Sequence, residues 1–444
     1  MGPGFLAEIG TAQSPLAEFE RIATAAGHDM SELEAGHLAT AYLRVGDIHS
    51  LRWWMSHAAE TARAKRLQSF DHFGGRARLW QGVHDRGEAY IFAGEPLEER
   101  DVERMGEHFP ARLKVVSARN IELAAAAVLD VSATAEDWEV GTREELYTLF
   151  NVGTLTIGPG ARVIVRGNVF SMVVQHLDVR ESGAREIGQD NHHIGILPTP
   201  HPVDSRLSGP LDGPSGSAGS DGQPGRDGKS LQFRASVFGP AAANTVAIID
   251  RDGNGGANGL DGQTGRRGRT GGMCKTAEIS IRSFAASSRP LTIFCQAGQG
   301  GRGGAGGKGG DGGQGGNAGR GGASFHDSQF GNAGAGGNGG NGGRGGNGGN
   351  GGISSNVFIS CPPNRAHLIA IKAVDSQGGF PGQGGAGGRG GMPGNGMTAT
   401  ATAAPGTPGR PGASGLAGRS RPKARIHINE ILQPNTRSFH RGKS

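Results

Sequence analysis

The sequence has few aromatic residues and few cysteines. Aromatic side chains make up 5% of the 444 residues and apolar side chains 35%, so an apolar core can form only outside the glycine-rich parts, mainly before residue 185. The three cysteines, Cys274, Cys295 and Cys361, are too few and too widely spaced for a disulfide framework or a zinc site. We expect buried, idle thiols; a bond between Cys274 and Cys295 in an oxidising compartment is the alternative.

Long apolar runs are also missing. No stretch approaches about 20 apolar residues, and the N-terminal MGPGFLAEIGTAQSP has neither a basic region nor an apolar region of adequate length. We therefore expect no conventional signal peptide and no membrane insertion. The formal net charge of +5 is mild and its basic residues are dispersed, so nucleic acid is not a predicted partner.

The N-terminal part, residues 1–110, is predicted to be a mainly helical docking or assembly domain. Apolar residues recur at spacings of three and four between residues 14 and 72, which is typical of amphipathic helices. Gly46 provides a break and Asp47 an N-cap between two of these helices. The apolar positions that define the pattern are Leu16, Phe19, Ile22, Ala23, Leu38, Tyr42, Leu43, Leu51, Trp54, Met55 and Ala58.

Residues 111–205 form a predicted β-rich region. In GTLTIGPGARVIVRGNVFSMVVQHLDV, apolar residues alternate with polar or small ones, and Gly158-Pro159-Gly160 and Gly167-Asn168 are turn signals. Strands of this length fit a β-solenoid or a small sandwich, and the pattern favours neither.

Residues 206–433 carry the dominant signal, which is glycine at every third position. The chain has 84 glycines, and the repeats fall into six tracts separated by short apolar segments with the alternation of strands. The expected strand segments are LQFRASVF with NTVAIID, AEISIRSF with PLTIFCQ, NVFISC with HLIAIKAV, and ARIHINEIL. Residues 434–444 are expected to be a flexible basic tail.

A period of three matches the polyproline-II helix, whose backbone groups point outward and can bond to neighbouring helices wherever glycine permits close approach. The tracts at 298–322 and 331–352 have two glycines in three and should lie inside a bundle, whereas the first two tracts and the last, with one in three, should be peripheral. A collagen-like trimer and disordered low complexity are the alternatives.

Short connections predict out-and-back pairs of tracts, so that the β segments stack at one end and the loops gather at the other. The proline-rich GILPTPHPVDSRLSG is expected to pair with the first tract. The candidate binding residues at the loop tips are His192, His193, His201, Phe325, His326, Asp327, Phe330, Met397, Thr398, Thr400 and Thr402.

The tracts GGRGGAGGKGGDGGQGG, GGNGGNGGRGGNGGNGG and GGQGGAGGRGGMPG resemble, in architecture, the polyglycine-II bundles of the receptor-binding adhesins of phage long tail fibres and of snow-flea antifreeze proteins. The resemblance to the adhesins implies that loops 323–330 and 397–405 contact a receptor. Ice binding is not expected, because residues at the variable positions, such as Arg302, Lys308 and Arg344, are bulky and charged.

Catalytic signatures are absent: we find no GxSxG, HExxH, P-loop or CxxC motif. His192, His193 and His201 with Asp190 and His326 could bind a metal, but incidental histidines in a solvated loop are the preferred interpretation, and no cofactor or metal is predicted. A β-solenoid carbohydrate-active enzyme is the competing class. Its candidate residues are Asp130, Asp137, Glu139, Asp178 and Glu181, with Arg162, Arg166 and Arg180.

The sequence thus predicts a non-enzymatic structural or adhesive protein, located outside the cell or on a cell or virion surface. Its loop tips would bind a surface glycan or an outer-membrane protein. The alternative is a self-associating filament, sheath or coat subunit that uses the faces of the bundle.

Overall fold

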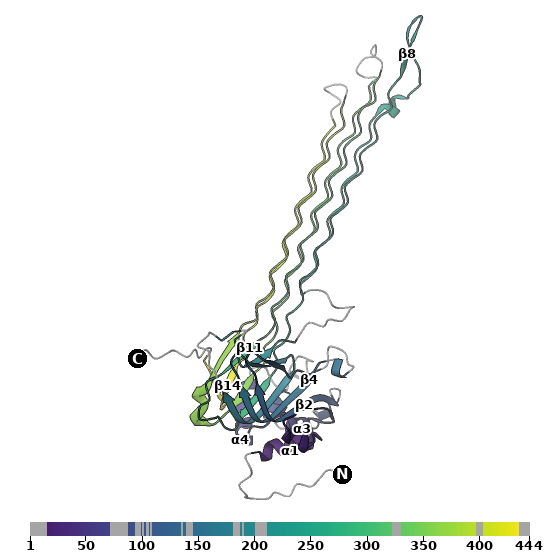
Figure 1. Ribbon diagram of the computed structural model, residues 1–444. Coiled ribbons are helices and arrows are strands. Elements are labelled where there is room, and N and C mark those ends of the chain that lie inside the picture. The colour runs from purple at the N-terminus through teal and green to yellow at the C-terminus, as the bar shows by residue number, and fades with distance from the viewer. Residues whose placement is uncertain are drawn as a thin grey trace.

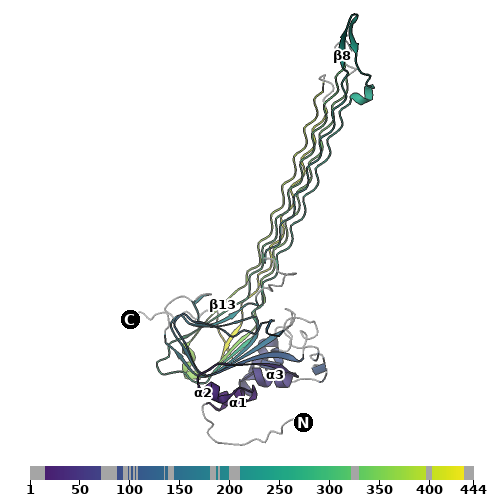
Figure 2. The ribbon, with the colours of Figure 1, turned by 45° about the vertical axis from the view of Figure 1, so that its right-hand side comes forward.

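The protein consists of a base built from two sheets and several helices, with a long glycine-rich shaft projecting from it (Figure 1, Figure 2). The computed structural model describes residues 16–71, 88–93, 99, 102–103, 106, 109–134, 136–138, 145–180, 187–188, 191–199, 211–321, 330–396 and 403–434. Within these residues the fold is mixed α/β, with mostly strands in large sheets and few helices.

The helices pack on the side of the base that is remote from the shaft (Figure 1). In α1, Phe19, Ile22 and Ala23 are buried, as their spacing predicts. Asp47 is an N-cap, as expected, because its carboxylate accepts a hydrogen bond of 2.8 Å from the backbone N–H of Ser50. The helices are α1 (Ala17–Ala25), α2 (Met30–Glu34), α3 (Ile48–Met55), α4 (Glu60–Asp71) and α6 (Glu88–Phe92).

One expected helix is wrong. The segment with Leu38, Tyr42 and Leu43 contains strand β1 (Ala39–Val45), which pairs antiparallel with β2 (Ala111–Leu123). Its sequence, ATAYLRV, also alternates with a period of two, and pairing with β2 decides in favour of the strand.

The remaining strands of the base form two mostly parallel sheets. The first has the order β1-β2-β4-β6-β10-β12-β14-β15 and the second β13-β11-β7-β5-β3. Their bounds are β3 (Val128–Asp130), β4 (Leu146–Ile157), β5 (Arg162–Arg166), β6 (Val169–Val179), β7 (Ile194–Leu197), β10 (Ala277–Ile281), β11 (Leu291–Gln296), β12 (Val357–Ser360), β13 (Ile369–Val374), β14 (Ile426–Ile428) and β15 (Ile431–Leu432). Short 3₁₀ helices are η2 (Glu136–Trp138), η3 (Ile248–Arg251) and η5 (Pro363–Leu368).

The base has a continuous core that combines early and late parts of the chain. Leu155, Val163, Ile279 and Ile293 all belong to one buried cluster that includes residues of both sheets. Strands on both sides of the boundaries suggested at residues 110 and 205 share this base, since β1 pairs with β2 and β6 pairs with β10. The later strand segments, AEISIRSF with PLTIFCQ, NVFISC with HLIAIKAV, and ARIHINEIL, contribute β10 to β15 to this base, so these segments stack at one end of the molecule as expected.

Six glycine-rich rods form the shaft, and the chain runs along them alternately away from the base and back. We number them in chain order as the first (211–230), second (252–273), third (297–321), fourth (330–353), fifth (376–396) and sixth rod (403–421). Between the second and third rods the chain passes through β10 and β11, and between the fourth and fifth through β12 and β13. The first two returns to the base thus each add a strand to both sheets, and the last return, after the sixth rod, adds β14 and β15 to the first sheet.

Backbone hydrogen bonds join the rods at every third residue. In the third rod, Gly300 donates to Gln377 of the fifth rod and Gly301 to Arg269 of the second, both at 2.9 Å. The third rod also accepts bonds from the first and fourth rods, and the fourth rod bonds to the second, third, fifth and sixth. The two middle tracts are therefore the interior ones, as predicted.

Glycine is required where the rods touch. A Cβ atom on Gly307 would lie 1.8 Å from the carbonyl oxygen of Ser217 in the first rod, and real Cβ atoms essentially never come that close. The sequence period of three therefore reflects close contact between backbones.

A second set of hydrogen bonds uses Asp and Asn side chains. Each aspartate in the rods accepts a backbone N–H from the rod two further along the chain; Asp261 of the second rod, for example, accepts the N–H of Asn341 in the fourth rod. The side chain of Asn341 accepts the N–H of Arg410 in the sixth rod in the same way. The acceptors are Asp212, Asp221, Asp227, Asp252, Asn258, Asp261, Asp311, Asn317, Asn338, Asn341, Asn347 and Asn350. These side chains satisfy outward N–H groups that glycine contacts do not reach.

The first rod pairs with the second rod. Asn254, for example, donates its backbone N–H to the carbonyl oxygen of Arg226 at 2.8 Å. Of the proline-rich segment that was expected to pair with the first tract, the start belongs to strand β7 of the base and residues 200–209 lie outside the described residues. In consequence, LQFRASVF lies at the far end of the shaft and not among the stacked strands, and NTVAIID contains η3 instead of a strand.

Candidate binding site at the far end of the shaft

A two-stranded hairpin ends the shaft, between the first and second rods (Figure 1, Figure 2). It consists of β8 (Phe233–Ser236) and β9 (Gly239–Ala242), which pair antiparallel. Two residues, Val237 and Phe238, connect the strands, and their side chains are 97% and 101% exposed. No other large apolar side chain among the described residues is as exposed as these two.

The turn itself does not require these two apolar side chains. Ser236 closes it, because its hydroxyl donates to the carbonyl oxygen of Gly239 at 2.5 Å and accepts the N–H of Phe238 at 3.3 Å. Gly239 has a φ of +102°, which favours glycine. Val237 and Phe238 do not have positive φ values, so ordinary residues fit this turn and its backbone does not require apolar ones.

At the foot of the hairpin, the side chain of Asn244 is used internally. Asn244 accepts the N–H of Gln232 at 2.7 Å and donates to the carbonyl oxygen of Ser230 at 3.1 Å. Ile248 and Ile249 of η3, in contrast, are 61% and 79% exposed. Among the described residues of the hairpin and η3, the exposed large side chains are therefore mostly aliphatic and aromatic.

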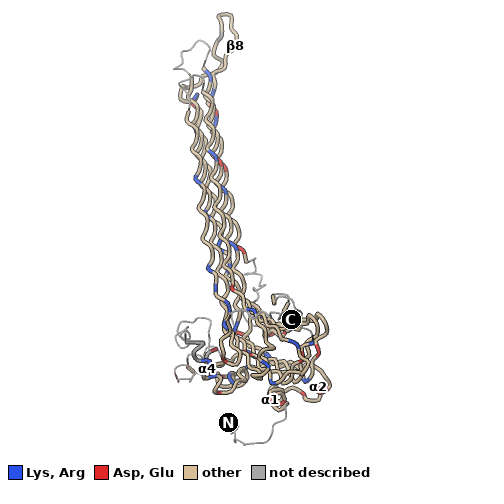
Figure 3. Tube along the Cα trace, turned by 90° about the vertical axis from the view of Figure 1, so that its left-hand side faces the viewer, with Lys and Arg blue, Asp and Glu red and all other residues tan. Residues whose placement is uncertain are grey.

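Charge is scarce at the same end. Between residues 230 and 249 the only charged residue is Arg234, and at the foot of the hairpin Lys229 pairs with Asp250 at 3.4 Å. The shaft below carries Lys, Arg and Asp along its length (Figure 3). The hairpin thus differs in chemistry from the shaft that supports it.

Most of the predicted tip residues fall outside the described residues: His201, Phe325, His326, Asp327, Met397, Thr398, Thr400 and Thr402. Phe330 is described and is partly buried where the fourth rod begins. The hairpin was missed because LQFRASVF was expected to pair with NTVAIID in the base, whereas its strand β8 pairs with Gly239–Ala242 at the far end of the shaft. The apolar dipeptide Val237-Phe238 in front of Gly239 is the signal that could have identified an exposed turn.

The placement of His192 and His193 at the tip is wrong. Both are buried in the base, at 4% and 6% exposure. The His192 ring stacks on Phe294 and contacts the carbonyl oxygen of Gly188 at 2.9 Å, and the backbone N–H of His193 donates to Thr292. They belong to the base because they come directly before β7 (Ile194–Leu197).

Metal and thiol chemistry finds no support in the described part of the chain. No group of three or more His, Cys, Asp or Glu residues there is arranged to hold a metal ion. Cys274, Cys295 and Cys361 are buried and free, so the alternative of a Cys274–Cys295 bond is wrong. Burial raises the pKa of Cys274 to about 12 and that of Cys361 to about 11, which leaves both thiols protonated and unreactive.

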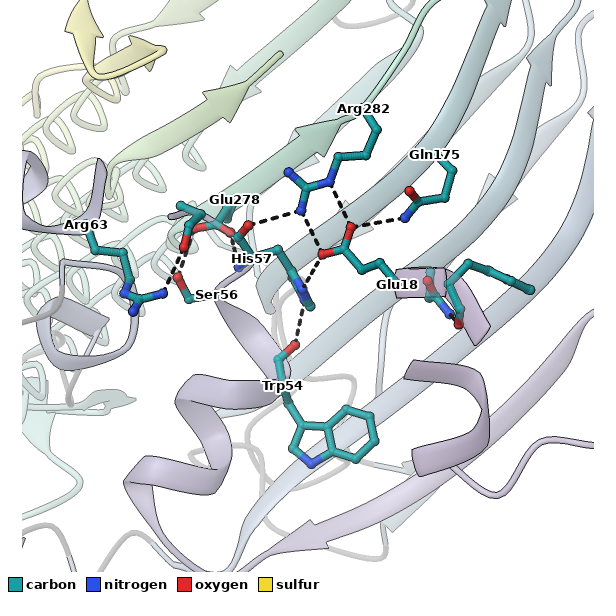
Figure 4. Close-up of polar contacts among 11 residues, drawn as sticks. Glu18, Trp54, Ser56, His57, Arg63, Gln175, Glu278 and Arg282 are labelled. Atoms are coloured by element: carbon teal, nitrogen blue, oxygen red, sulfur yellow. Dashed lines mark hydrogen bonds and ion pairs between the residues drawn. The ribbon is translucent and has the colours of Figure 1, made fainter. Parts of the chain in front are cut away.

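Within the base, a cluster of polar side chains joins the helices to the first sheet (Figure 4). The carboxylate of Glu18 accepts hydrogen bonds from Nε and Nη2 of Arg282, at 2.8 and 2.7 Å, and lies 3.6 Å from Nδ1 of His57. Burial alone would raise the pKa of Glu18, but hydrogen bonds from His57 and Arg282 together hold it well below its usual value. Beside it, Glu278 accepts the backbone N–H of His57.

Arg66 extends this cluster to the end of the chain. Its guanidinium pairs with Glu278 and, at 2.8 Å, with Glu430. The side chains of Arg66 and Glu278 are fully buried, so solvent and substrate have no access to the pair. The cluster is therefore a structural connection between α4, β10 and the C-terminal hairpin β14–β15.

The described acidic residues of the enzyme alternative each have partners of their own, and Asp137 accepts the backbone N–H of Thr134 at 2.8 Å. Asp130 pairs with Arg166 at 3.4 Å and accepts from Ser132, while Asp178 lies 3.6 Å from Arg180. Glu139 and Glu181 lie outside the described residues.

Comparisons with known proteins give no relatives: no family model, no curated protein and no solved structure matches this chain. In the described residues, no helix combines the length and the apolar character that crossing a membrane would demand.

Proposed function

We propose that this chain is a non-enzymatic structural or adhesive protein that presents the far end of a polyglycine-II-type shaft to a partner on a surface. The observation that carries the proposal is the hydrogen-bonded shaft that ends in a hairpin with fully exposed Val237 and Phe238. In this proposal the base is a β-solenoid, and the rods are long excursions from its successive coils.

The shaft suits a protein in which the base and the far-end hairpin must be held far apart. A rod of the length of the third would extend roughly 75 Å at the polyproline-II rise of about 3.1 Å per residue. Hydrogen bonds to neighbours at every third residue offset the conformational entropy that glycine loses on ordering. The shaft would hold the hairpin away from the base as a stiff spacer, on a cell or virion surface.

The sixth rod lies at an edge of the shaft, and its sequence favours presentation of the far end over side-by-side assembly of several chains. In the sixth rod, the glycine N–H groups bond to the fifth rod and the residues that follow them bond to asparagines of the fourth. The third N–H of each turn faces outward, and prolines remove it at residues 405, 408 and 411. Proline at such an edge opposes the addition of another chain.

The test is orientation-dependent binding. The full chain would be biotinylated through a single introduced cysteine, either at Thr245 beside the hairpin or at Glu122 on the base, and offered isolated bacterial outer membranes and a glycan array. The proposal predicts binding by protein immobilised through the base and loss of binding by protein immobilised through the tip. Equal binding in both orientations, or none in either, would contradict it.

A further inference from the structure

We infer that the shaft has a binding face for an acidic polysaccharide, on the side formed by the second, fourth and sixth rods. We call this side the even face, and the side formed by the first, third and fifth rods the odd face. The even face is separate from the far-end hairpin, so the inference goes beyond the proposed function. It is carried by a regular series of arginines, by a row of asparagines with free donors, and by the lack of Asp and Glu in the fourth and sixth rods.

The second, fourth and sixth rods lie side by side, with the fourth in the middle. Gly262 of the second rod donates its N–H to the carbonyl oxygen of Asn341 in the fourth, and Gly342 donates to Arg410 in the sixth, both at 2.8 Å. The two glycines of each fourth-rod turn face the second and fifth rods, where an added Cβ atom would meet backbone oxygens. The remaining residue of each turn therefore points outward from the even face.

Exposed arginines occur at four successive turns of this face, one at each turn. From the far end toward the base, they are Arg410, Arg344, Arg267 and Arg419. Their levels follow from the backbone bonds between the rods: the N–H of Gly268 donates to Asn347, which places Arg267 beside it, and the N–H of Gly351 donates to Arg419. At a rise of about 3.1 Å per residue, an arginine recurs about every 9 Å along the shaft.

These four guanidinium groups are available to a partner. With the described residues, their side chains form no ion pair and no hydrogen bond. Cations of the odd face are engaged, in contrast: Lys308 pairs with Asp311 at 3.0 Å, and Arg302 lies over the ring of Phe380 at 5.7 Å from its centroid. The acidic residue beside the series, Asp261 of the second rod, has one carboxylate oxygen bonded to a fourth-rod N–H. Positive charge is therefore uncompensated along the fourth and sixth rods.

The asparagines of the fourth rod add hydrogen-bond donors to the same face. The side-chain oxygens of Asn341, Asn347 and Asn350 each accept a backbone N–H of the sixth rod. Because the bonded group is a donor, the carboxamide oxygen must point toward the sixth rod, and the two N–H groups of each amide remain for another partner. Arginine likewise has donors and no acceptor. The face therefore fits a partner that is rich in acceptors and negatively charged.

The spacing of the donors favours a polysaccharide among such partners. A polymer in which acidic and neutral sugars alternate offers carboxylates at intervals to the arginines, and hydroxyl oxygens between them to the amides. Duplex DNA carries one negative charge per about 1.7 Å of its axis, so arginines about 9 Å apart would leave most phosphates unpaired. The four turns also contain no aromatic side chain on which the bases of a single strand could stack. Since several weak contacts act together on one polymer, long chains should bind more tightly than short ones.

The test uses the full chain in solution and two quadruple variants. R267Q/R344Q/R410Q/R419Q removes the arginines of the even face, and R302Q/K308Q/R320Q/R389Q is the matched control, because it removes four exposed cations from the odd face. Glutamine already occupies outward positions of the rods at Gln299, Gln314 and Gln383, so both variants should keep the melting temperature of the wild type, which thermal unfolding would verify.

Four polymers separate the classes of partner. Hyaluronan alternates acidic and neutral sugars, dextran has hydroxyl groups without acid, poly-L-glutamate has carboxylates without hydroxyl groups, and duplex DNA has dense phosphate charge. Titration calorimetry at low and high salt would measure the affinity of each protein for each polymer, and for hyaluronan chains of two lengths.

The inference predicts that hyaluronan binds the wild type and the odd-face variant alike, and the even-face variant at least about tenfold more weakly, since several exposed ion pairs are lost together. Binding should weaken with added salt and strengthen with chain length. Tighter binding of dextran, poly-L-glutamate or DNA than of hyaluronan would overturn the class of partner. Absence of hyaluronan binding by the wild type, or equal affinity of the two variants, would overturn the face.

The far-end hairpin is unchanged in the even-face variant. The orientation-dependent binding expected from the proposed function can therefore be measured on that variant, and either proposal can fail while the other stands.

Discussion

The asparagines of the fourth rod allow the shaft to be tested by removing one set of hydrogen bonds. Asn338, Asn341, Asn347 and Asn350 accept backbone N–H groups of the sixth rod, at 2.8, 2.9, 2.9 and 3.0 Å. Replacing all four by alanine removes these acceptors and leaves every glycine contact in place. We therefore expect the sixth rod to detach more easily while the rest of the shaft persists.

The magnitude follows from the exposure of these bonds. A typical intramolecular hydrogen bond contributes about 0.5–1.5 kcal/mol net, and water can replace the lost acceptor here, so the lower half of that range applies. Four bonds then stabilise the sixth rod by about 2 to 4 kcal/mol. Opening should become at least about 30-fold more frequent.

Amide hydrogen exchange measures that opening directly. Protection at Gly409, Gly412, Gly415 and Gly418, whose acceptors in the fifth rod remain in the quadruple variant, should fall by this factor. Arg344→Ala is the matched control, because Arg344 lies on the same face between Asn341 and Asn347 and has no carboxamide to accept a bond. Equal loss of protection in the control, or unchanged protection in the quadruple variant, would refute the role assigned to the asparagines.

Three further predictions concern packing, buried charge and pH. Gly307→Ala should destabilise the shaft by about 1 to 3 kcal/mol, because its Cβ would lie 1.8 Å from a carbonyl oxygen of the first rod, whereas Lys308→Ala on the outward position should change little; thermal unfolding distinguishes them. Arg66→Met should lower the free energy of unfolding by about 3 to 5 kcal/mol, since it leaves Glu278 buried and unpaired, and the double variant with Glu278→Gln should recover much of the loss. Burial and neighbouring arginines lower the pKa of His427 from 6.5 to about 4, so the folded state binds fewer protons than the unfolded state. Denaturant titrations should therefore show about 3 kcal/mol of stability lost as the pH falls from about 6.5 to 4, and a His427→Gln variant should lack that part of the loss.

The glycine period predicts much of the shaft. Two glycines in three identify the third and fourth rods as interior, because only a backbone without Cβ can approach neighbours on two faces. The short connections predict that the third rod pairs with the fourth and the fifth with the sixth, which the hydrogen bonds confirm.

The hydrogen-bond partners of the outward residues could not be predicted in the same way. Asp261, Asn341 and Arg410 look like arbitrary residues at variable positions until the register of three rods is known. Register depends on where β10, β12 and β14 align in the base, and a single sequence does not encode that alignment in any local pattern.

The binding end was misplaced for a related reason. The segment around Phe233 has the same alternation as the strands of the base, and period alone does not say at which end of the shaft a strand pair lies. Likewise, His192 and His193 lie in a segment with turn residues, but β7 follows within two residues and buries them against its neighbours.

The length of a single rod tests the central claim most directly. Spin labels on Gln299→Cys and Arg320→Cys would occupy exposed positions near the two ends of the third rod, and the native thiols are buried and remain unlabelled. An ordered shaft predicts one narrow distance of about 65 Å at a rise of about 3.1 Å per residue. A broad distribution centred near about 25 Å, as for a flexible glycine-rich chain, would contradict the account.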